Sequence, residues 1–358
     1  LVQLDRAEAA LQLLDFFTQG LPDPALLALR NRIAAQNSVP PYGFLTNAQQ
    51  GLAEVFYTMA EALAADAGSN SLPLLYARAA NGIDPSHTDA LILTGRLLAD
   101  SEQFGLAAEA YGQVPLGDAV YTEAQLGRAD AYFDDGRQDE AVAVLQSLAA
   151  DMPELATVHA AYADVLRRTD RCAEAVTAYT AALDLVDITQ SRNWFLYYAR
   201  GICRENLDDF DGSEVDFRQA LVLNPEQPLV LNNLGYSLVE QRRNLDEALG
   251  MIERAVQGQP DSGYIVDSLG WVLYRLGRFE EAVAPMERAV SLLPNDPIIN
   301  DHLGDVYWMV GRQREARFQW ERALSFEPED AEADRIRRKL DIGLDRVLAE
   351  EGGVGEAK

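Results

Sequence analysis

A small residue recurs along this chain with a period of about 34 positions. It stands at Gly95, Ala129, Ala163, Gly201, Gly235, Gly270 and Gly304, at intervals of 34, 34, 38, 34, 35 and 34 residues. A fixed period of this length is typical of structural repeats that cannot bury their apolar faces alone and must stack. The chain is therefore predicted to be an array of repeats rather than a set of globular domains.

Each repeat predicts two antiparallel helices. A second small residue follows about one helix after the first, at Ala107, Ala141, Ala175, Ser213, Ala248, Ala282 and Ala316. A large apolar residue comes four positions later, at Tyr111, Leu145, Tyr179, Phe217, Ile252, Met286 and Trp320. Helices approach closely only where side chains are small, so the small residues mark the crossings and the large ones fill the space between them.

Proline and glycine mark the ends of these helices. Proline closes most repeats, at Pro153, Pro225, Pro260, Pro294 and Pro328. A proline cannot continue a helix, so it separates one repeat from the next. Glycine stands in the turn between the paired helices at Gly136, Gly277 and Gly311. A left-handed backbone is expected at these three turns.

The repeats divide the chain into five segments. Seven repeats are predicted at 88–121, 122–155, 156–190, 194–227, 228–262, 263–296 and 297–330, and residues 46–87 read as a degenerate one. Residues 1–45 are predicted to be helices that remain from upstream repeats, ending in a proline-rich break at 38–44. Because the chain begins at Leu1 inside a helical pattern, we expect it to be a piece of a longer protein.

The segment at 331–351 is predicted to be a single capping helix, and 352–358 a disordered tail. One stripe of the helix carries Ile336, Leu340, Leu344 and Val347, and its polar side carries Arg335, Arg337, Arg338 and Lys339. A terminal helix needs one face on the last repeat and one in water. The four cations are therefore expected in solvent.

Three stretches carry a family resemblance: "NNLGYSLVEQRRNLDEALGMIERAVQGQP", "DSLGWVLYRLGRFEEAVAPMERAVSLLP" and "DHLGDVYWMVGRQREARFQWERALSFEP". They are similar to tetratricopeptide repeats at nearly every signature position. The resemblance implies an all-α fold, a right-handed superhelical solenoid of stacked helix-turn-helix repeats. It also implies a scaffold that binds proteins or peptides in a concave groove lined by the first helix of each repeat.

The charge and the scattered histidines exclude several classes of function. Thirty basic and 57 acidic residues give a formal net charge of −27, which repels nucleic acids and anionic lipids. No apolar stretch is long enough to span a bilayer, so this segment is not expected to insert into a membrane. His87, His159 and His302 are too far apart along the array to form a metal site. With no phosphate-binding loop or nucleophile motif, we expect no cofactor and no catalysis.

Cys172 and Cys203 leave two alternatives open. Cys172 is predicted near the start of a second helix, and Cys203 within the first helix of the next repeat. These two regions lie near each other in a stack of helices. A disulfide would imply an oxidising compartment, whereas the alternative is a pair of small buried side chains.

Positions two, five, nine and twelve of each first helix should face the groove, because residues three and four apart share one helix face. In the last three repeats these positions hold Leu229, Asn232, Tyr236, Val239, Tyr264, Asp267, Trp271, Tyr274, Ile298, Asp301, Asp305 and Trp308. Asn233 lies beside the row, and Arg275 is its main cation. Rings would anchor a ligand and the Asn and Asp side chains would bind an extended backbone.

Two interpretations of these groove positions stay open. Asn232 and Asn233 resemble the asparagines with which some tetratricopeptide proteins hold a C-terminal carboxylate, but the accompanying lysines are missing, so a neutral or basic segment fits better. For Trp271 and Trp308, packing between helices is the alternative to ligand binding.

A narrower resemblance covers Leu231 to Pro328. The stretch "LNNLGY…YIVDSLGWVLYRLGR…DHLGDVYWMVGR…EARFQWERAL" is similar to large bacterial envelope tetratricopeptide proteins. Some of these are outer-membrane lipoproteins that serve as adaptors of a periplasmic C-terminal processing protease. The resemblance implies an adaptor in the bacterial periplasm. A cytoplasmic co-chaperone or regulatory scaffold, and an enzyme whose catalytic domain lies upstream, are the alternatives.

Overall fold

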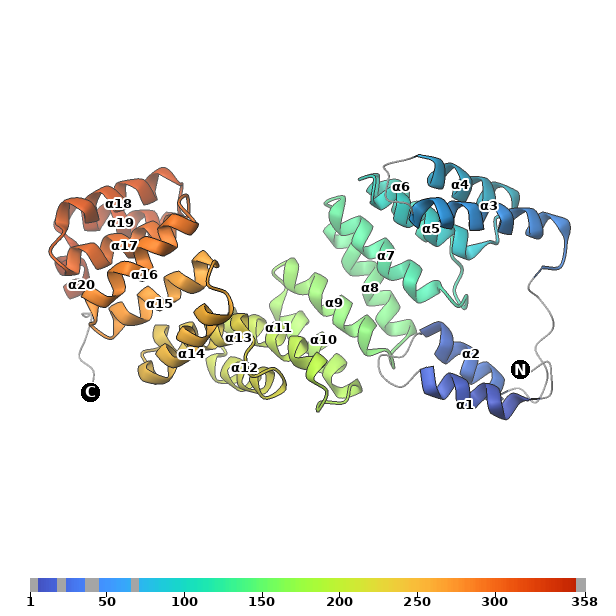
Figure 1. The fold of residues 1–358 in the computed structure, drawn as a ribbon, viewed down its shortest axis with the longest axis horizontal. Helices are drawn as coiled ribbons and strands as arrows, with labels where there is room; N and C mark the ends of the chain where they lie inside the picture. Colours follow the sequence, from blue (N-terminus) through green and yellow to red (C-terminus); the bar gives the residue numbers. More distant parts are fainter. Residues whose placement is uncertain (1–5, 18–23, 36–44, 66–70, 352–358) are drawn as a thin grey trace. The chain divides into compact units, whose positions relative to one another are not determined.

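The computed structural model describes residues 6–17, 24–35, 45–65 and 71–351. Within these ranges every regular element is a helix, and none of the helices is both long and apolar enough to cross a membrane. The chain divides into two modules, Leu1–Val186 and Asp187–Lys358, which we call the N-terminal and C-terminal modules. Figure 1 shows the helices of each module in chain order.

The N-terminal module consists of paired helices. They are α1 (Ala7–Phe17) with α2 (Pro24–Ala35), α3 (Ala48–Ala65) with α4 (Leu72–Ile83), α5 (Thr88–Ala99) with α6 (Phe104–Tyr111), α7 (Tyr121–Asp134) with α8 (Gln138–Asp151), and α9 (Ala156–Arg168) with α10 (Cys172–Leu185). From α3 onward each pair also packs against the next pair. The degenerate repeat predicted at 46–87 is therefore a helix pair like the others.

The C-terminal module continues the pattern after a 3-10 turn, η2 (Ser191–Asn193). Its pairs are α11 (Trp194–Glu205) with α12 (Phe210–Leu223), α13 (Pro228–Glu240) with α14 (Leu245–Gly258), α15 (Gly263–Arg275) with α16 (Phe279–Leu292), and α17 (Pro297–Met309) with α18 (Gln313–Ser325). First helices also pack against one another, α13 on α15 and α15 on α17. The predicted all-α solenoid of stacked helix-turn-helix repeats is confirmed.

The predicted helix crossings are present within the repeats. A methyl group added at Gly235 would lie under 3.0 Å from Ile252, and one added at Gly270 would meet Met286 equally closely. The same relation joins Gly304 to Trp320. Each small residue thus gives room to the large apolar residue of its own repeat, as the sequence pattern predicts.

The turns between paired helices confirm the predicted left-handed backbone. Gly136, Gly277 and Gly311 have φ values of +76°, +73° and +79°. Such a conformation is costly for most side chains and free for glycine.

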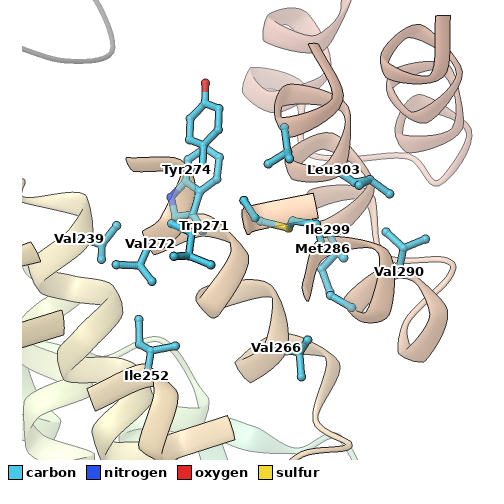
Figure 2. Close-up of a cluster of buried hydrophobic side chains, with 14 of the residues drawn as sticks. Val239, Ile252, Val266, Trp271, Val272, Tyr274, Met286, Val290, Ile299 and Leu303 are labelled. Atoms are coloured by element: carbon cyan, nitrogen blue, oxygen red, sulfur yellow. The ribbon is translucent and has the colours of Figure 1, made fainter. Parts of the chain in front are cut away.

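The core of the C-terminal module runs continuously through its repeats. Figure 2 shows side chains from α13 to α17 gathered around α15, including Val239, Ile252, Val272, Met286 and Ile299. All five are at most 1% exposed. Because each helix pair buries its apolar face on the next, no repeat has a separate core.

The end of the module differs from the single capping helix predicted at 331–351. The structure has α19 (Asp330–Ile342) and α20 (Leu344–Glu350), separated at Gly343 with φ +84°. Helix α19 begins 33 residues after α17 (330 − 297), so it occupies the place of a further first helix. The break at 38–44 and the tail at 352–358 lie outside the described residues.

Candidate functional site

Six of the predicted groove residues line one cavity of about 600 Å³ in the C-terminal module, which we call the inner cavity. They are Asn232, Asn233, Tyr236, Tyr264, Asp267 and Ile298. Helices α11, α13, α15 and α17 all contribute to its wall, so first helices do line a common surface. Cavities of this size accommodate small ligands or a few peptide side chains.

In the C-terminal module, the second position of α11, α13, α15 and α17 carries an exposed apolar side chain. Phe195 is 39% exposed, Leu229 40%, Tyr264 61% and Ile298 51%. We call these four residues the apolar row. Tyr264 and Ile298 also line the inner cavity, so at this end the row and the cavity form one surface.

The two asparagines face the cavity from α13. The amide of Asn233 donates to the Tyr198 hydroxyl at 3.3 Å. Asn232 Oδ1 is shielded from solvent and accepts no hydrogen bond from the described residues. A buried carbonyl oxygen without a donor is unfavourable, so this position has a cost to the fold.

Asp267 is buried against a histidine that the groove pattern does not include. His302 Nδ1 lies 3.0 Å from Asp267 Oδ2, and the His302 ring stacks on Trp271 with ring centres 4.0 Å apart. Burial alone would lower the pKa of His302, but the negative charge and hydrogen bond of Asp267 outweigh it and raise that pKa. The pair therefore favours the protonated imidazole.

Trp271, Tyr274 and Arg275 lie on a second cavity of about 260 Å³. Trp271 is 9% exposed, and its Nε1 donates to Glu240 at 2.7 Å. Arg275 donates to the same carboxylate oxygen at 3.2 Å. Tyr274 is buried and stacks on Trp271 with ring centres 4.8 Å apart. These residues chiefly hold α15 against α13. For Trp271 this arrangement favours packing between helices over ligand binding.

Asp301 and Asp305 are both paired with α19, which buries Asp305 and leaves the Asp301 side chain 14% exposed. Lys339 Nζ lies 2.7 Å from Asp301 Oδ2 and 2.6 Å from Asp305 Oδ1, and its side chain is 0% exposed. Burial raises the pKa of Asp305, and the ammonium of Lys339 opposes that rise. The expectation that Lys339 faces solvent was wrong, since the two carboxylates of α17 hold it inside.

Trp308 is likewise covered by the end of the chain. Its Nε1 donates to Asp345 of α20 at 3.1 Å, and its ring packs on Trp320 with ring centres 5.3 Å apart. Trp308 thus joins the last repeat to the terminal helix pair. The structure brings together groove residues of α13 and α15 with Ile298 of α17, whereas Asp305 and Trp308 of α17 pack against the helix pair that follows.

Among the polar residues of the inner cavity that the sequence analysis did not name are Glu205, Glu240 and His302. Glu205 stands at position twelve of α11, one repeat before the three whose groove positions were named, whereas Glu240 and His302 fall outside the pattern of two, five, nine and twelve. A signal for His302 was available: it stands 35 residues after Asp267, one repeat along, where neighbouring first helices meet. The histidines were considered only as metal ligands.

The cysteines lie in different modules. Cys172 begins α10 and Cys203 lies in α11, and both side chains are buried. The disulfide between them stays a prediction. In the described ranges, no three His, Cys, Asp or Glu side chains are grouped so that they could hold a metal ion.

Comparison with known proteins gives a sequence relative and two similar folds. A TPR repeat-containing protein of Pseudomonas aeruginosa is 31% identical over 185 residues, which is 51% of this chain and 30% of that protein. The chain thus spans less than a third of the length of this curated relative.

Two solved structures share the fold alone. A tetratricopeptide repeat protein from Parabacteroides merdae has a TM-score of 0.54 and 18% identity, covering 66% of this chain and 94% of that one. A chain of the Cut9–Hcn1 hetero-tetramer of the APC/C also has a TM-score of 0.54, at 17% identity, covering 80% of this chain and 58% of that one.

The tetratricopeptide repeat family model matches residues 92–156, 198–263 and 232–297. Each range begins within a first helix and extends to the start of the first helix two repeats further on, and the last two ranges include most of the inner cavity's wall. The chain therefore contains tetratricopeptide repeats, at residues 92–156 and 198–297.

Proposed function

We propose that the C-terminal module holds an extended segment of another protein against α11, α13, α15 and α17, as a non-catalytic scaffold. The observation that carries this proposal is the apolar row, one exposed large side chain in each of four successive repeats. Contiguous exposed apolar surface in a folded protein marks an interaction site. The equivalent positions of the N-terminal module hold Asp89, Glu123 and Thr157, so this feature belongs to the C-terminal module.

The spacing of the row suggests how a ligand would match it. Packed helices lie about 8–10 Å apart, and an extended polyproline II chain, with three residues per turn, advances about 3.1 Å per residue. A bound segment would therefore place an apolar side chain on successive repeats about every third residue. The amides of Asn232 and Asn233 lie beside the row and could bond the backbone between those side chains.

The test is a double substitution in the row. Tyr264→Ser with Ile298→Ser should weaken capture of protein partners at least about tenfold, because exposed anchors supply most of the binding energy. Val222→Ser with Phe318→Ser is the matched control, since these side chains are 70% and 61% exposed on second helices. Equal loss in both variants, or no loss in the first, would refute the role of the row.

We further propose that this scaffold is an adaptor for a processing protease in the bacterial envelope. Support comes from the resemblance of Leu231 to Pro328 to envelope adaptors, and from a relative in Pseudomonas aeruginosa. Mixing the chain with the C-terminal processing protease of its own source organism should give a complex on size-exclusion chromatography. Independent elution of the two proteins would count against the adaptor, and capture of cytoplasmic proteins alone would favour the co-chaperone alternative.

A further inference from the structure

The wall of the inner cavity is acidic. Glu205, Glu240, Asp267 and Asp296 line it together with apolar side chains, and the lining contains no lysine or arginine. The one group there that can carry positive charge is His302, which Asp267 already holds. A ligand entering this cavity therefore meets an excess of negative charge, in addition to the net charge of −27 of the whole chain.

Three of the four carboxylates are held by a cationic side chain or an N–H donor of the protein, whereas Glu205 is held by the Ser237 hydroxyl. Asp267 faces His302, Asp296 accepts the Ile299 amide at 3.0 Å, and Glu240 accepts from Trp271 and Arg275. Glu205 differs. Burial raises the pKa of its carboxyl, and only a hydrogen bond from the Ser237 side chain opposes this. A cation beside Glu205 would relieve the cost of keeping it ionised.

We propose that the inner cavity takes a lysine or arginine side chain of the bound segment, with its charged end at Glu205 and its aliphatic stem along Tyr236. This inference rests on the proposed function and adds the chemistry of the partner: a basic residue among apolar ones. The charge of the cavity excludes acidic segments, and its apolar walls favour a long stem over a short polar side chain.

Carboxylates from three helices act on Tyr236. Burial raises the pKa of its phenol, the negative charges of Glu240, Asp267 and Glu205 add to the effect, and the positive charge of Arg275 opposes it. These three acids come from α11, α13 and α15, yet all act on one hydroxyl group. A cationic end group placed at Tyr236 would meet carboxylates from three successive repeats, and the ring face would stabilise it further.

Elsewhere in the module the protein already holds a lysine against carboxylates of a first helix. One repeat further on, Lys339 of α19 is fully buried with its ammonium between Asp301 and Asp305. Asp301 occupies the same position of its helix as Asp267 does in α15. The last repeat thus demonstrates, with the chain's own side chain, that carboxylates on first helices can receive and desolvate a lysine.

The experiment compares three pools of nonapeptides on the immobilised full chain. The pools share random apolar and neutral residues and differ only in a central lysine, norleucine or glutamate. The lysine pool should be retained about tenfold more than the norleucine pool, since hydrogen bonds to charged groups are the stronger ones, and the glutamate pool least. The lysine preference should shrink as the salt concentration rises.

Two variants separate the charge from the apolar row. Glu205→Gln should remove most of the lysine preference, whereas Glu253→Gln, an exposed acid of α14 with the same charge change, should keep it. If all three pools are retained alike, and this retention is lost in the Tyr264→Ser and Ile298→Ser double variant, the cation inference is overturned. The proposed scaffold function would then still be supported. Retention of no pool would overturn both.

Discussion

At the scale of single residues, His302 makes the stability of the C-terminal module depend on pH. Its folded-state pKa is raised above the ordinary value of 6.5 by Asp267. Protonation therefore stabilises the fold fully below about pH 6.5, and that contribution is lost as pH rises through the raised value. Urea midpoints measured from about pH 6 to about pH 9 should fall in the wild type.

The matched comparison for this effect uses another histidine. His302→Gln should flatten the decline, while His159→Gln, in the N-terminal module, should leave it unchanged. A decline of equal slope in the His302 variant would mean that other groups control the pH dependence.

Lys339 gives a second prediction at this scale. Lys339→Met removes the ammonium that contacts both Asp301 and Asp305 and leaves them the more distant Arg335, at 3.9 Å and 3.7 Å, so it should destabilise the module by about 3–5 kcal/mol. The triple variant that also changes both aspartates to asparagine should recover much of the loss, because uncompensated charge rather than missing volume causes it. Thermal or urea unfolding measures both. Equal stability of the single and triple variants would contradict this account.

At the scale of helices, the crossings control stability. Gly304→Ala places a methyl group against Trp320 and should cost about 1–3 kcal/mol through overpacking. Gly250→Ala in α14 meets nothing within 4 Å, so better helix propensity should stabilise it by up to about 1 kcal/mol. Unfolding midpoints that move in opposite directions would confirm the crossing, whereas two equal shifts would reject it.

The parts of the fold that could be predicted from the sequence are those that depend on local signals. Helix pairs and turns followed from local signals, since small residues, prolines and turn glycines each act within one repeat. The fate of Asp301 and Asp305 did not, because it depends on Lys339, which lies 38 residues after Asp301 in a separate helix pair. Groove positions are also where neighbouring first helices touch, so helix periodicity alone cannot separate ligand-facing from helix-facing side chains.

At the scale of the whole molecule, each module has its own buried clusters. The large core cluster from Phe217 to Leu344 lies entirely within residues 187–358. Residues 187–358 expressed alone should therefore fold, giving a helical circular dichroism spectrum and a cooperative transition, and should retain the lysine-containing pool as the full chain does. A segment that stays unfolded would show that the N-terminal module is needed for its structure.

The ion pairs between α17 and α19 limit where repeats can be added by gene duplication. Extra copies of a repeat inserted ahead of Pro297 leave Lys339 beside Asp301 and Asp305, whereas an insertion between Ser325 and Asp330 parts them. The final repeat and its terminal helices must then be inherited as one block.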